Sequence, residues 1–319
     1  MSNYTVAPAP HVHGGNKVKK NMLNVIIALM PAYLAGIWYF GVGALIVSCV
    51  AMASCVAFEW LISKFLLKKQ PQINDLSALL TGLLLGMNLP SSLPWWMVVI
   101  GSLIAIGIGK MSFGGLGNNL FNPALVGRVF LLISFPAAMT TWPIPAPFTF
   151  DGSVDALTAA TPLSYIKESI FTTFTNAEMA LGEIGGSLGE TSSVALLLGL
   201  VYLLATRTIS WHIPVSIIGT VLIFTGIMHG IDPCTYASPL LHITSGGLLL
   251  GSIFMATDYV TSPMTKTGQI IFGVGIGLIT MVIRLFGSYP EGISFAILIM
   301  NAVVPLINRY IRPKRFGAK

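Results

Sequence analysis

The chain has 319 residues, of which 54% are hydrophobic and only 9% are charged. Soluble domains carry roughly 25% charged residues, so a mean hydropathy of +0.81 with so little charge excludes an ordinary soluble protein. The 17 Lys and Arg outnumber the 11 Asp and Glu, which gives a net charge of +6. In a membrane protein the positions of the basic residues along the chain indicate the topology, so we do not interpret this excess as a sign of nucleic-acid binding. The sequence therefore predicts an all-α integral membrane protein.

The cysteines carry no metal or disulfide pattern. Cys49 and Cys55 lie in an apolar run, where we interpret them as small core residues, and Cys234 stands alone in a short connection. Neither a disulfide framework nor an iron–sulfur cluster is expected. A basic stretch at 17–20 precedes the first apolar run, which lacks a small-residue cleavage site and is expected to be retained as a helix.

Ten apolar runs, separated by Gly, Pro and charged residues, are each expected to cross the membrane once as a helix. In chain order the predicted spans are 21–40, 43–62, 75–89, 94–110, 118–136, 192–206, 211–229, 239–257, 269–287 and 291–309. The run at 75–89 is short for a complete crossing, which favours a broken or half helix. Residues 1–20 form an N-terminal tail, and residues 310–319 form a basic C-terminal tail.

The basic residues test this topology, because Lys and Arg concentrate in cytoplasmic loops. With a cytoplasmic N-terminus, fourteen of the 17 fall on the cytoplasmic side, Lys167 alone falls outside, and Arg128 and Arg284 remain within or near spans. The fourteen are Lys17, Lys19, Lys20, Lys64, Lys68, Lys69, Lys110, Arg207, Lys266, Arg309, Arg312, Lys314, Arg315 and Lys319. Both termini of this multi-pass protein of the cell membrane are therefore predicted to be cytoplasmic.

One long connection, residues 137–191, falls on the outer face in this topology. Loops of this length are usually either functional or disordered, and aromatic residues such as Trp142 and Tyr165 among its polar residues favour an ordered loop. We therefore treat this outer loop as a candidate site. Thr161 precedes Pro162 there, and by itself a hydroxyl in such a position is expected to be an ordinary turn residue.

An internal repeat relates the two halves of the chain. Residues 80–86 (LTGLLLG) resemble residues 245–251 (SGGLLLG), and each stretch is followed by a proline, Pro90 or Pro263, and then by a Gly-spaced helix. The offset covers five crossings, an odd number, so the halves are expected to face opposite ways across the membrane. The two predicted five-helix repeats are residues 21–136 and residues 192–309.

Polar residues within membrane spans cost free energy unless they are paired or have a function. A first cluster of them lies at 113–124 (FGGLGNNLFNPA). In a helix Asn119 and Asn122 share one face. Such an amide pair suits a flat polar ligand, such as the edge of a flavin ring, or an ion; alternatively, an Asn caps a helix that starts near Pro123. Arg128 is expected to meet an anionic partner, in a structural ion pair or in a phosphate or flavin contact.

A second polar cluster closes the span at 239–257. Asp258 follows this run, with hydroxyls such as that of Thr261 nearby. A carboxylate beside hydroxyl groups suits a hard cation such as sodium, whereas a solvated residue at the membrane boundary is the alternative. Further along, Arg284 and Glu291 flank an outer turn and are predicted to pair across it as a structural contact.

These separated motifs together resemble one known family. Residues 75–82, 114–124, 158–163, 254–263 and 289–292 follow one another in the order expected of the NqrB/RnfD membrane subunits of redox-driven ion pumps. The compact chain is more similar to the RnfD branch, from the complex that passes electrons between ferredoxin and NAD while moving sodium or protons. NqrB, the corresponding membrane protein of the sodium-pumping quinone reductase, has a longer N-terminal region.

The resemblance implies a covalent flavin on the outer loop. In the family, the threonine that matches Thr161 carries FMN through a phosphoester bond, which a separate flavin transferase adds. The motif read by that transferase matches Asp155, Thr158 and Ala160 as well as Thr161. The predicted topology also places Thr161 outside, where the family attaches its FMN.

The resemblance further implies a non-covalent riboflavin near the Asn-rich motif and an ion path near the second polar cluster. The candidate flavin contacts are Asn119, Asn122, Pro123 and Arg128. Phe254 and Asp258 match the positions implicated in the ion path of the quinone-reductase relatives.

The predicted function is that of a membrane flavoprotein subunit of a ferredoxin:NAD oxidoreductase type of ion pump, with no catalytic side chain and no metal site of its own. Its expected partners are the other membrane and iron–sulfur subunits, the flavin transferase and lipid. The alternative is a solute channel or transporter without a redox role, because two inverted five-helix repeats resemble the urea- and ammonium-channel-like fold. A covalent flavin distinguishes the two functions, since a channel has no need of one.

Overall fold

The computed structural model describes residues 18–68, 70, 73–145, 158–159, 161, 163, 182, 185–233, 235–287, 289 and 291–312. Most of these residues are helical, and the strands among them are the two-residue pair β1 (Trp142–Pro143) and β2 (Thr158–Ala159). The predicted helical class is confirmed. Much of the predicted outer loop and most of both predicted tails lie outside the described residues.

The first helix, α1 (Val18–Leu61), is 44 residues long and runs into a π-helical turn, η1 (Ile62–Leu66). A straight helix of that length would span about 66 Å, roughly twice the hydrocarbon core of a bilayer. Gly41, at φ 62° and ψ −143°, interrupts it, and the hydroxyls of Tyr33 and Ser48 on either side meet at 2.7 Å. The chain therefore doubles back at Gly41 and forms the first two predicted helices.

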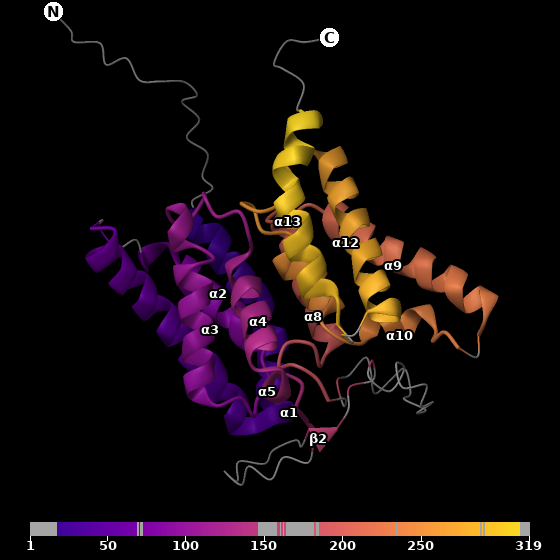
Figure 1. Ribbon diagram of the computed structural model, residues 1–319, viewed down its shortest axis with the longest axis horizontal. Helices are drawn as coiled ribbons and strands as arrows, with labels where there is room; N and C mark the ends of the chain where they lie inside the picture. The colour runs from indigo at the N-terminus through magenta and orange to yellow at the C-terminus, as the bar shows by residue number, and fades with distance from the viewer. Residues whose placement is uncertain are drawn as a thin grey trace, which may run out of the picture.

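A group of short helices follows α1 in the chain. They are η2 (Ile73–Asp75), α2 (Ser77–Met87), α3 (Trp95–Gly107), η3 (Met111–Phe113), α4 (Pro123–Ser134) and α5 (Pro136–Met139). Of this group, η2, α2 and α3 pack directly against α1. Figure 1 shows this group in indigo to magenta, and α3 contacts both α1 and α4. Since all but one of the 11 residues of α2 are buried, this short helix lies inside the group and not on its lipid-facing surface.

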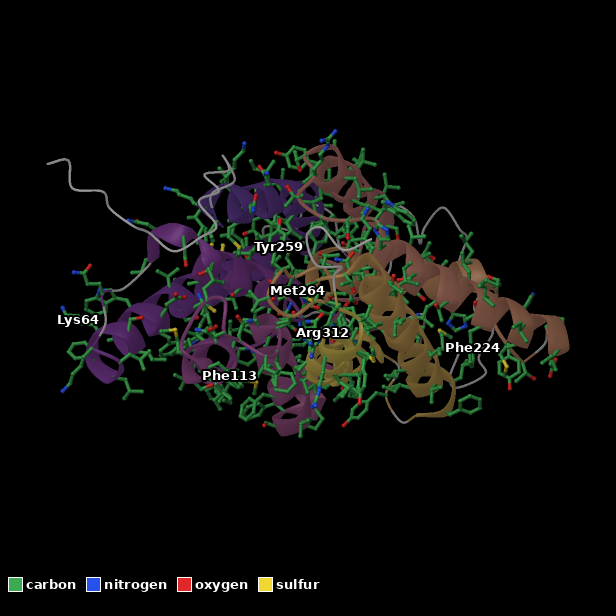
Figure 2. The ribbon with its side chains drawn as sticks, turned by 90° about the horizontal axis from the view of Figure 1, so that it is seen from above. Lys64, Phe113, Phe224, Tyr259, Met264 and Arg312 are labelled. Atoms are coloured by element: carbon green, nitrogen blue, oxygen red, sulfur yellow. The ribbon has the colours of Figure 1, made fainter. Side chains whose placement is uncertain are left out.

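The second group of helices comprises α8 (Ser193–Ala205), α9 (His212–Ile231), α10 (Pro239–Thr244), α11 (Leu248–Leu250), η4 (Gly251–Met255), α12 (Lys266–Phe286) and α13 (Ile293–Tyr310). Within it α12 packs between α9 and α13. The two groups meet where α8 contacts α1 and where α13 contacts α4. In the view from above, Lys64 and Phe224 lie toward opposite edges of the molecule, with Tyr259 between them (Figure 2).

Helices occupy every predicted apolar run, with two differences in detail. The run at 118–136 becomes helical only at Pro123, and the run at 239–257 is interrupted between Thr244 and Leu248. In the described part of the chain, five helices are long and apolar enough to cross a membrane. They are Val18–Leu66, Trp95–Phe113, His212–Ile231, Lys266–Phe286 and Ile293–Tyr310.

The contact between α1 and α2 depends on Gly82. A Cβ at this position would lie 2.6 Å from Met52 Cα and 2.7 Å from the Ala51 carbonyl oxygen. Gly82→Ala must therefore push two backbones apart, and we expect it to destabilise the protein by about 1–3 kcal/mol.

Gly219→Ala on α9 is the matched control, because nothing lies within 4 Å of a Cβ there. This change is expected to be neutral or to stabilise the helix by up to about 1 kcal/mol. Thermal unfolding of the two purified variants measures the difference, and an equal loss of stability in both would contradict this packing.

Candidate functional site

The helix formed by residues 239–255 is broken in the middle. α10 ends at Thr244 and α11 begins at Leu248, and between them Gly246 has φ +69°, a conformation that glycine adopts without steric penalty. Such a break leaves backbone carbonyls free at the end of one helix and N–H groups free at the start of the next. In a membrane interior these groups must find partners within the protein.

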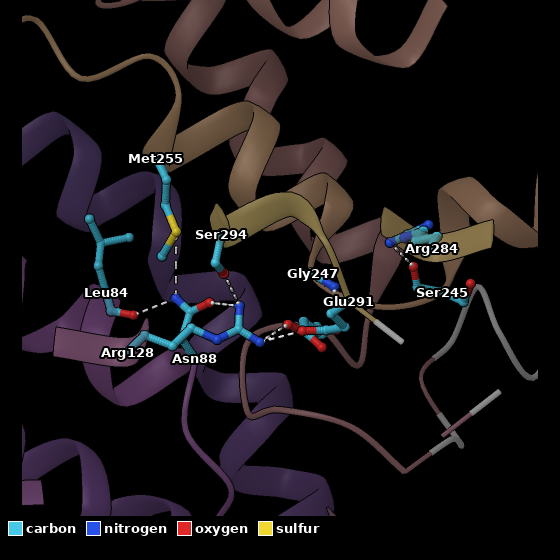
Figure 3. A network of polar contacts seen from close by, with 10 residues as sticks. Leu84, Asn88, Arg128, Ser245, Gly247, Met255, Arg284, Glu291 and Ser294 are labelled. Carbon is cyan, nitrogen blue, oxygen red and sulfur yellow. Dashed lines mark hydrogen bonds and ion pairs between the residues drawn. The ribbon is translucent and has the colours of Figure 1, made fainter. Parts of the chain in front are cut away.

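Charged side chains meet both ends of this break (Figure 3). Arg284 of α12 donates to the carbonyl oxygen of His242 at 2.5 Å and to that of Ser245 at 3.2 Å. Glu291 accepts from the N–H of Gly247 at 2.9 Å. A cation thus lies at the C-terminal end of α10 and an anion at the N-terminal end of α11, as the helix dipole favours.

Arg128 connects this break to the first group of helices. Its buried guanidinium is ion-paired with Glu291, and its Nη2 lies 3.5 Å from Glu190 Oε1. Its Nη1 donates to the side-chain oxygens of Asn88 and Ser294, both at 2.9 Å. The guanidinium therefore joins α4, the end of α2, the start of α13 and the turn before α8 in one network (Figure 3).

The predicted ion pair between Arg284 and Glu291 is wrong, because each residue has a different partner. Glu291 is ion-paired with Arg128, while Arg284 donates to backbone carbonyls. The physical reason is the helix break, which creates buried acceptors that need a donor. Arg128, in turn, has the anionic partner that the sequence predicts for it, and its contacts within the described residues are to protein groups.

The segment that contains Thr161 lies beside this network. Thr161 and Leu163 are both buried, and a Cβ at Gly246 would lie 2.6 Å from Leu163 Cδ1. Just before Thr161, β2 pairs with β1 in antiparallel orientation. The residues of the predicted transferase motif that lie outside the described part of the chain are Asp155 and Ala160.

A cavity of about 70 Å³ lies between the two helix groups. Its wall brings together the two polar clusters that the sequence predicts separately: Asn119, Asn122 and Pro123 from one, Phe254 and Asp258 from the other. The other polar residues of the wall are Ser77, Thr81, Lys110, Thr257 and Tyr259. Arg128 does not line this cavity, so the structure divides the candidate residues between two places.

The two asparagines of the cavity have different roles. Asn122 caps α4, because its side-chain oxygen accepts from two backbone N–H groups of the first turn, at 3.1 and 3.4 Å, and its amide donates to Met255 O at 3.1 Å. Asn119 precedes the helix, so the predicted shared helix face is wrong. Its amide donates to Phe121 O at 3.1 Å, while its buried Oδ1 has no partner in the described part of the chain.

Asp258 closes the other side of the cavity. It accepts from the Thr261 hydroxyl at 3.1 Å, whereas Thr257 donates to the carbonyl oxygen of Ile253 at 2.6 Å. Phe254 is buried beside it. The hydroxyl of Thr261, predicted near this carboxylate, therefore contacts it, whereas that of Thr257 bonds to the backbone.

A buried ion pair at the edge of the cavity escaped the sequence analysis. Lys110 Nζ lies 2.7 Å from Glu59 Oε2 and donates to the Ser77 hydroxyl at 2.6 Å, and that hydroxyl donates to Asp75 at 2.7 Å. The topology assigns Lys110 to a cytoplasmic loop. The available signal was Glu59, since a carboxylate within an apolar run is expensive unless it is paired.

The fold and the cavity define a multi-pass helical membrane protein with a polar site between two helix groups. The model of the NQR2, RnfD, RnfE family matches residues 5–317, and the chain belongs to this family. The family resemblance predicted from the motifs is thereby confirmed.

Three relatives show how far the similarity extends. The D subunit of the proton-translocating ferredoxin:NAD(+) oxidoreductase complex of Clostridium ljungdahlii is 46% identical over 325 residues, which cover 99% of this chain and 97% of that protein. The D subunit of the Na(+)-translocating ferredoxin:NAD(+) oxidoreductase complex of Acetobacterium woodii is 45% identical, with 99% and 96% covered. The D subunit of the ion-translocating oxidoreductase complex of Stutzerimonas stutzeri is 42% identical, with 95% and 93% covered.

Arg284 is expected to stabilise the broken helix. Arg284→Met leaves the carbonyls of His242 and Ser245 buried without their donor, at a cost of about 1–3 kcal/mol for each, so the variant should unfold at a lower temperature. Arg284→Lys keeps the charge and should retain part of the stability. A Met variant that melts like the wild type would contradict the role given to this arginine.

Proposed function

We propose that this chain is the membrane flavoprotein subunit of a redox-driven ion pump that passes electrons between ferredoxin and NAD, with FMN bound covalently to Thr161. Its family membership covers nearly the whole chain, and the relatives from C. ljungdahlii and A. woodii are named as subunits of ion-translocating ferredoxin:NAD(+) oxidoreductase complexes. The observation that carries the proposal is the single cavity that gathers the Asn119 and Asp258 clusters. The remaining membrane and iron–sulfur subunits and a flavin transferase are its partners.

The proposed architecture has ten crossings in two inverted repeats. The contacts of the two groups run in parallel: α2 packs on α1 and α4 as η4 packs on α9 and α13, and α3 packs on α4 as α12 packs on α13. The third crossing is short in one group and broken in the other. Transport folds with inverted repeats place their sites on such discontinuous helices.

The proposed orientation has both termini in the cytoplasm and Thr161 on the outer face. The asymmetry of the basic residues supports it. Lys20 and Arg207 line a second, polar cavity that shares Tyr259 with the wall of the cavity of Asn119 and Asp258. In this orientation both cavities lie toward the cytoplasm, and the Arg128 network lies toward the outer face.

The residues around Thr161 fit a covalent flavin. Thr161 supplies the hydroxyl for the phosphoester, and Leu163 packs its segment against the helix break. FMN, when bound, supplies the electron-transfer chemistry, which the protein positions and tunes. Arg128 and Arg284, both buried near the same break, place positive charge where negative charge would be poorly screened.

We place the second, non-covalent flavin against the wall of this cavity. Most of its wall is apolar, as small-molecule sites generally are, and Asn119 Oδ1 offers an acceptor that lacks a donor among the described residues. Phe254 and Asp258 on the same wall are the residues that we propose for the ion path, because a carboxylate with the Thr261 hydroxyl suits a hard cation.

Thr161→Ala is expected to abolish covalent flavin attachment, because it removes the hydroxyl that forms the ester. Co-expression with the flavin transferase, followed by intact-protein mass and in-gel flavin fluorescence, measures the outcome. Thr140→Ala, at an exposed threonine early in the same loop, should keep both signals. If the wild-type chain carries neither added mass nor fluorescence while the transferase modifies another substrate, the flavoprotein proposal is contradicted and the channel or transporter function is favoured.

Asn119→Leu is expected to weaken the non-covalent flavin about tenfold, because one buried hydrogen bond is lost and an apolar group replaces the acceptor. Flavin released by denaturation, counted per chain and separated from the covalent fraction, measures this. Asn118→Leu changes the exposed neighbour and should leave the flavin content as it is. Full retention of released flavin in the Asn119 variant would rule out this contact.

A further inference from the structure

The turn before α8 carries three buried oxygen atoms that have no hydrogen-bond partner among the described residues. They are Ser187 Oγ, Glu190 Oε1 and Thr191 Oγ1. The three residues are 0%, 5% and 1% exposed. Because buried polar atoms are nearly always paired, this concentration of unpaired oxygens in one turn points to a ligand that completes them.

The turn is held in place by the end of α2. The N–H of Gly189 donates to Met87 O at 2.7 Å, and that of Glu190 donates to Ser187 O at 3.1 Å. Gly247 makes room for the carboxylate, since a Cβ there would lie 2.5 Å from Glu190 Oε1. The Ser187 hydroxyl lies close enough to the Glu190 carboxyl to lower its pKa, so the two groups face the same space.

The two carboxylates around this space are held unequally. Glu190 and Glu291 share Arg128, and Arg284, the other nearby cation, donates to backbone carbonyls that include that of His242. Glu291 is hydrogen-bonded to Arg128 and to a backbone N–H, whereas Glu190 Oε1 accepts no hydrogen bond from the described residues. A buried carboxylate oxygen that accepts no hydrogen bond is costly, so a cation beside Glu190 Oε1 would stabilise it.

We propose that Glu190, Ser187 and Thr191 form a binding site for one monovalent cation, either a sodium ion or a proton, beneath the outer face. A carboxylate oxygen with two hydroxyl oxygens suits a small hard cation, and a proton on Glu190 meets the same need for charge. The guanidinium of Arg128 nearby disfavours a divalent ion, because the repulsion rises with the charge of the ion.

The surroundings of Glu190 favour its protonated form. Burial and the neighbouring Glu291 raise the pKa of Glu190 to about 8, against the opposing effects of Arg128 and Ser187. None of the three site residues lines the cavity of Asn119 and Asp258, so this is a separate site. It rests on the turn and its neighbours and does not require a flavin on Thr161.

The sodium arm of the test uses the purified complex at a pH above about 8, where Glu190 is ionised. Sodium chloride replaces choline chloride at constant ionic strength, and the unfolding temperature is followed. With sodium at about ten times its Kd, the wild type should gain about 3 °C. Glu190→Gln and Ser187→Ala should lose this gain, and Thr191→Ser, which keeps the hydroxyl, should retain it.

The proton arm records infrared difference spectra of the same complex across a pH titration. If the cation is a proton, a carboxylic-acid band disappears with a midpoint near about 8, is absent from Glu190→Gln, and moves to higher pH in Ser187→Ala. Folded Glu190 then holds its proton to a higher pH than the usual value of 4.5, so stability is lost as the pH rises between these two values. Glu190→Gln should flatten that slope.

The proposal is overturned if the wild type shows neither a sodium-dependent unfolding temperature nor a titrating carboxylic-acid band. Should Glu190→Gln fail to assemble, Ser187→Ala and Thr191→Val carry the test, because they keep the charge and remove only the oxygens. Thr161→Ala, which lacks the covalent flavin, should keep the sodium or proton response. A failure of this site is therefore distinguishable from a failure of the flavin assignment.

Discussion

A helix that is interrupted inside a bilayer has to satisfy its free backbone groups within the protein, and this requirement organises the centre of the molecule. Arg284 and Glu291 meet the two ends of the break. Because Glu291 is itself an anion in a poorly solvated place, it needs Arg128. Arg128 in turn is held by Asn88 at the end of α2 and by Ser294 on α13. One local break thus fixes how helices from both halves of the chain meet.

Two short helices, α2 and the η4 segment, connect the Arg128 network to the cavity. α2 contributes Thr81 to the cavity wall and ends at Asn88, which holds Arg128; its 11 residues span only about 16 Å. Asn88 also contacts Met255 Sδ at 3.7 Å, and Met255 O accepts from Asn122. A change of charge in the Arg128 network is therefore linked to the cavity through tightly packed elements, which transmit displacement with little slack.

The positions of the helices were predictable because lipid demands long apolar runs, and the runs at 192–206 and 211–229 match α8 and α9 closely. The partners of the buried charges were not. Arg128 and Glu291 are 163 residues apart, and no local periodicity joins them. A broken or half helix was expected at 75–89, where shortness was the signal, and α2 is a half-length helix of 11 residues. The break at 245–247 in the second group was not predicted. The local signal there was the Ser245-Gly246-Gly247 stretch, whereas the charges that satisfy the two ends of the break come from distant parts of the sequence.

The most direct test of this account is a double-mutant cycle between Arg128 and Glu291, measured as unfolding free energies of Arg128→Met, Glu291→Gln and the double variant. Buried, hydrogen-bonded charge pairs show coupling energies of about 1.5–7 kcal/mol, and each single change should leave a costly unpaired charge. We predict a coupling of about 3 kcal/mol, with the double variant more stable than Arg128→Met alone. A coupling near zero would contradict the claim that this ion pair holds the two halves of the chain together.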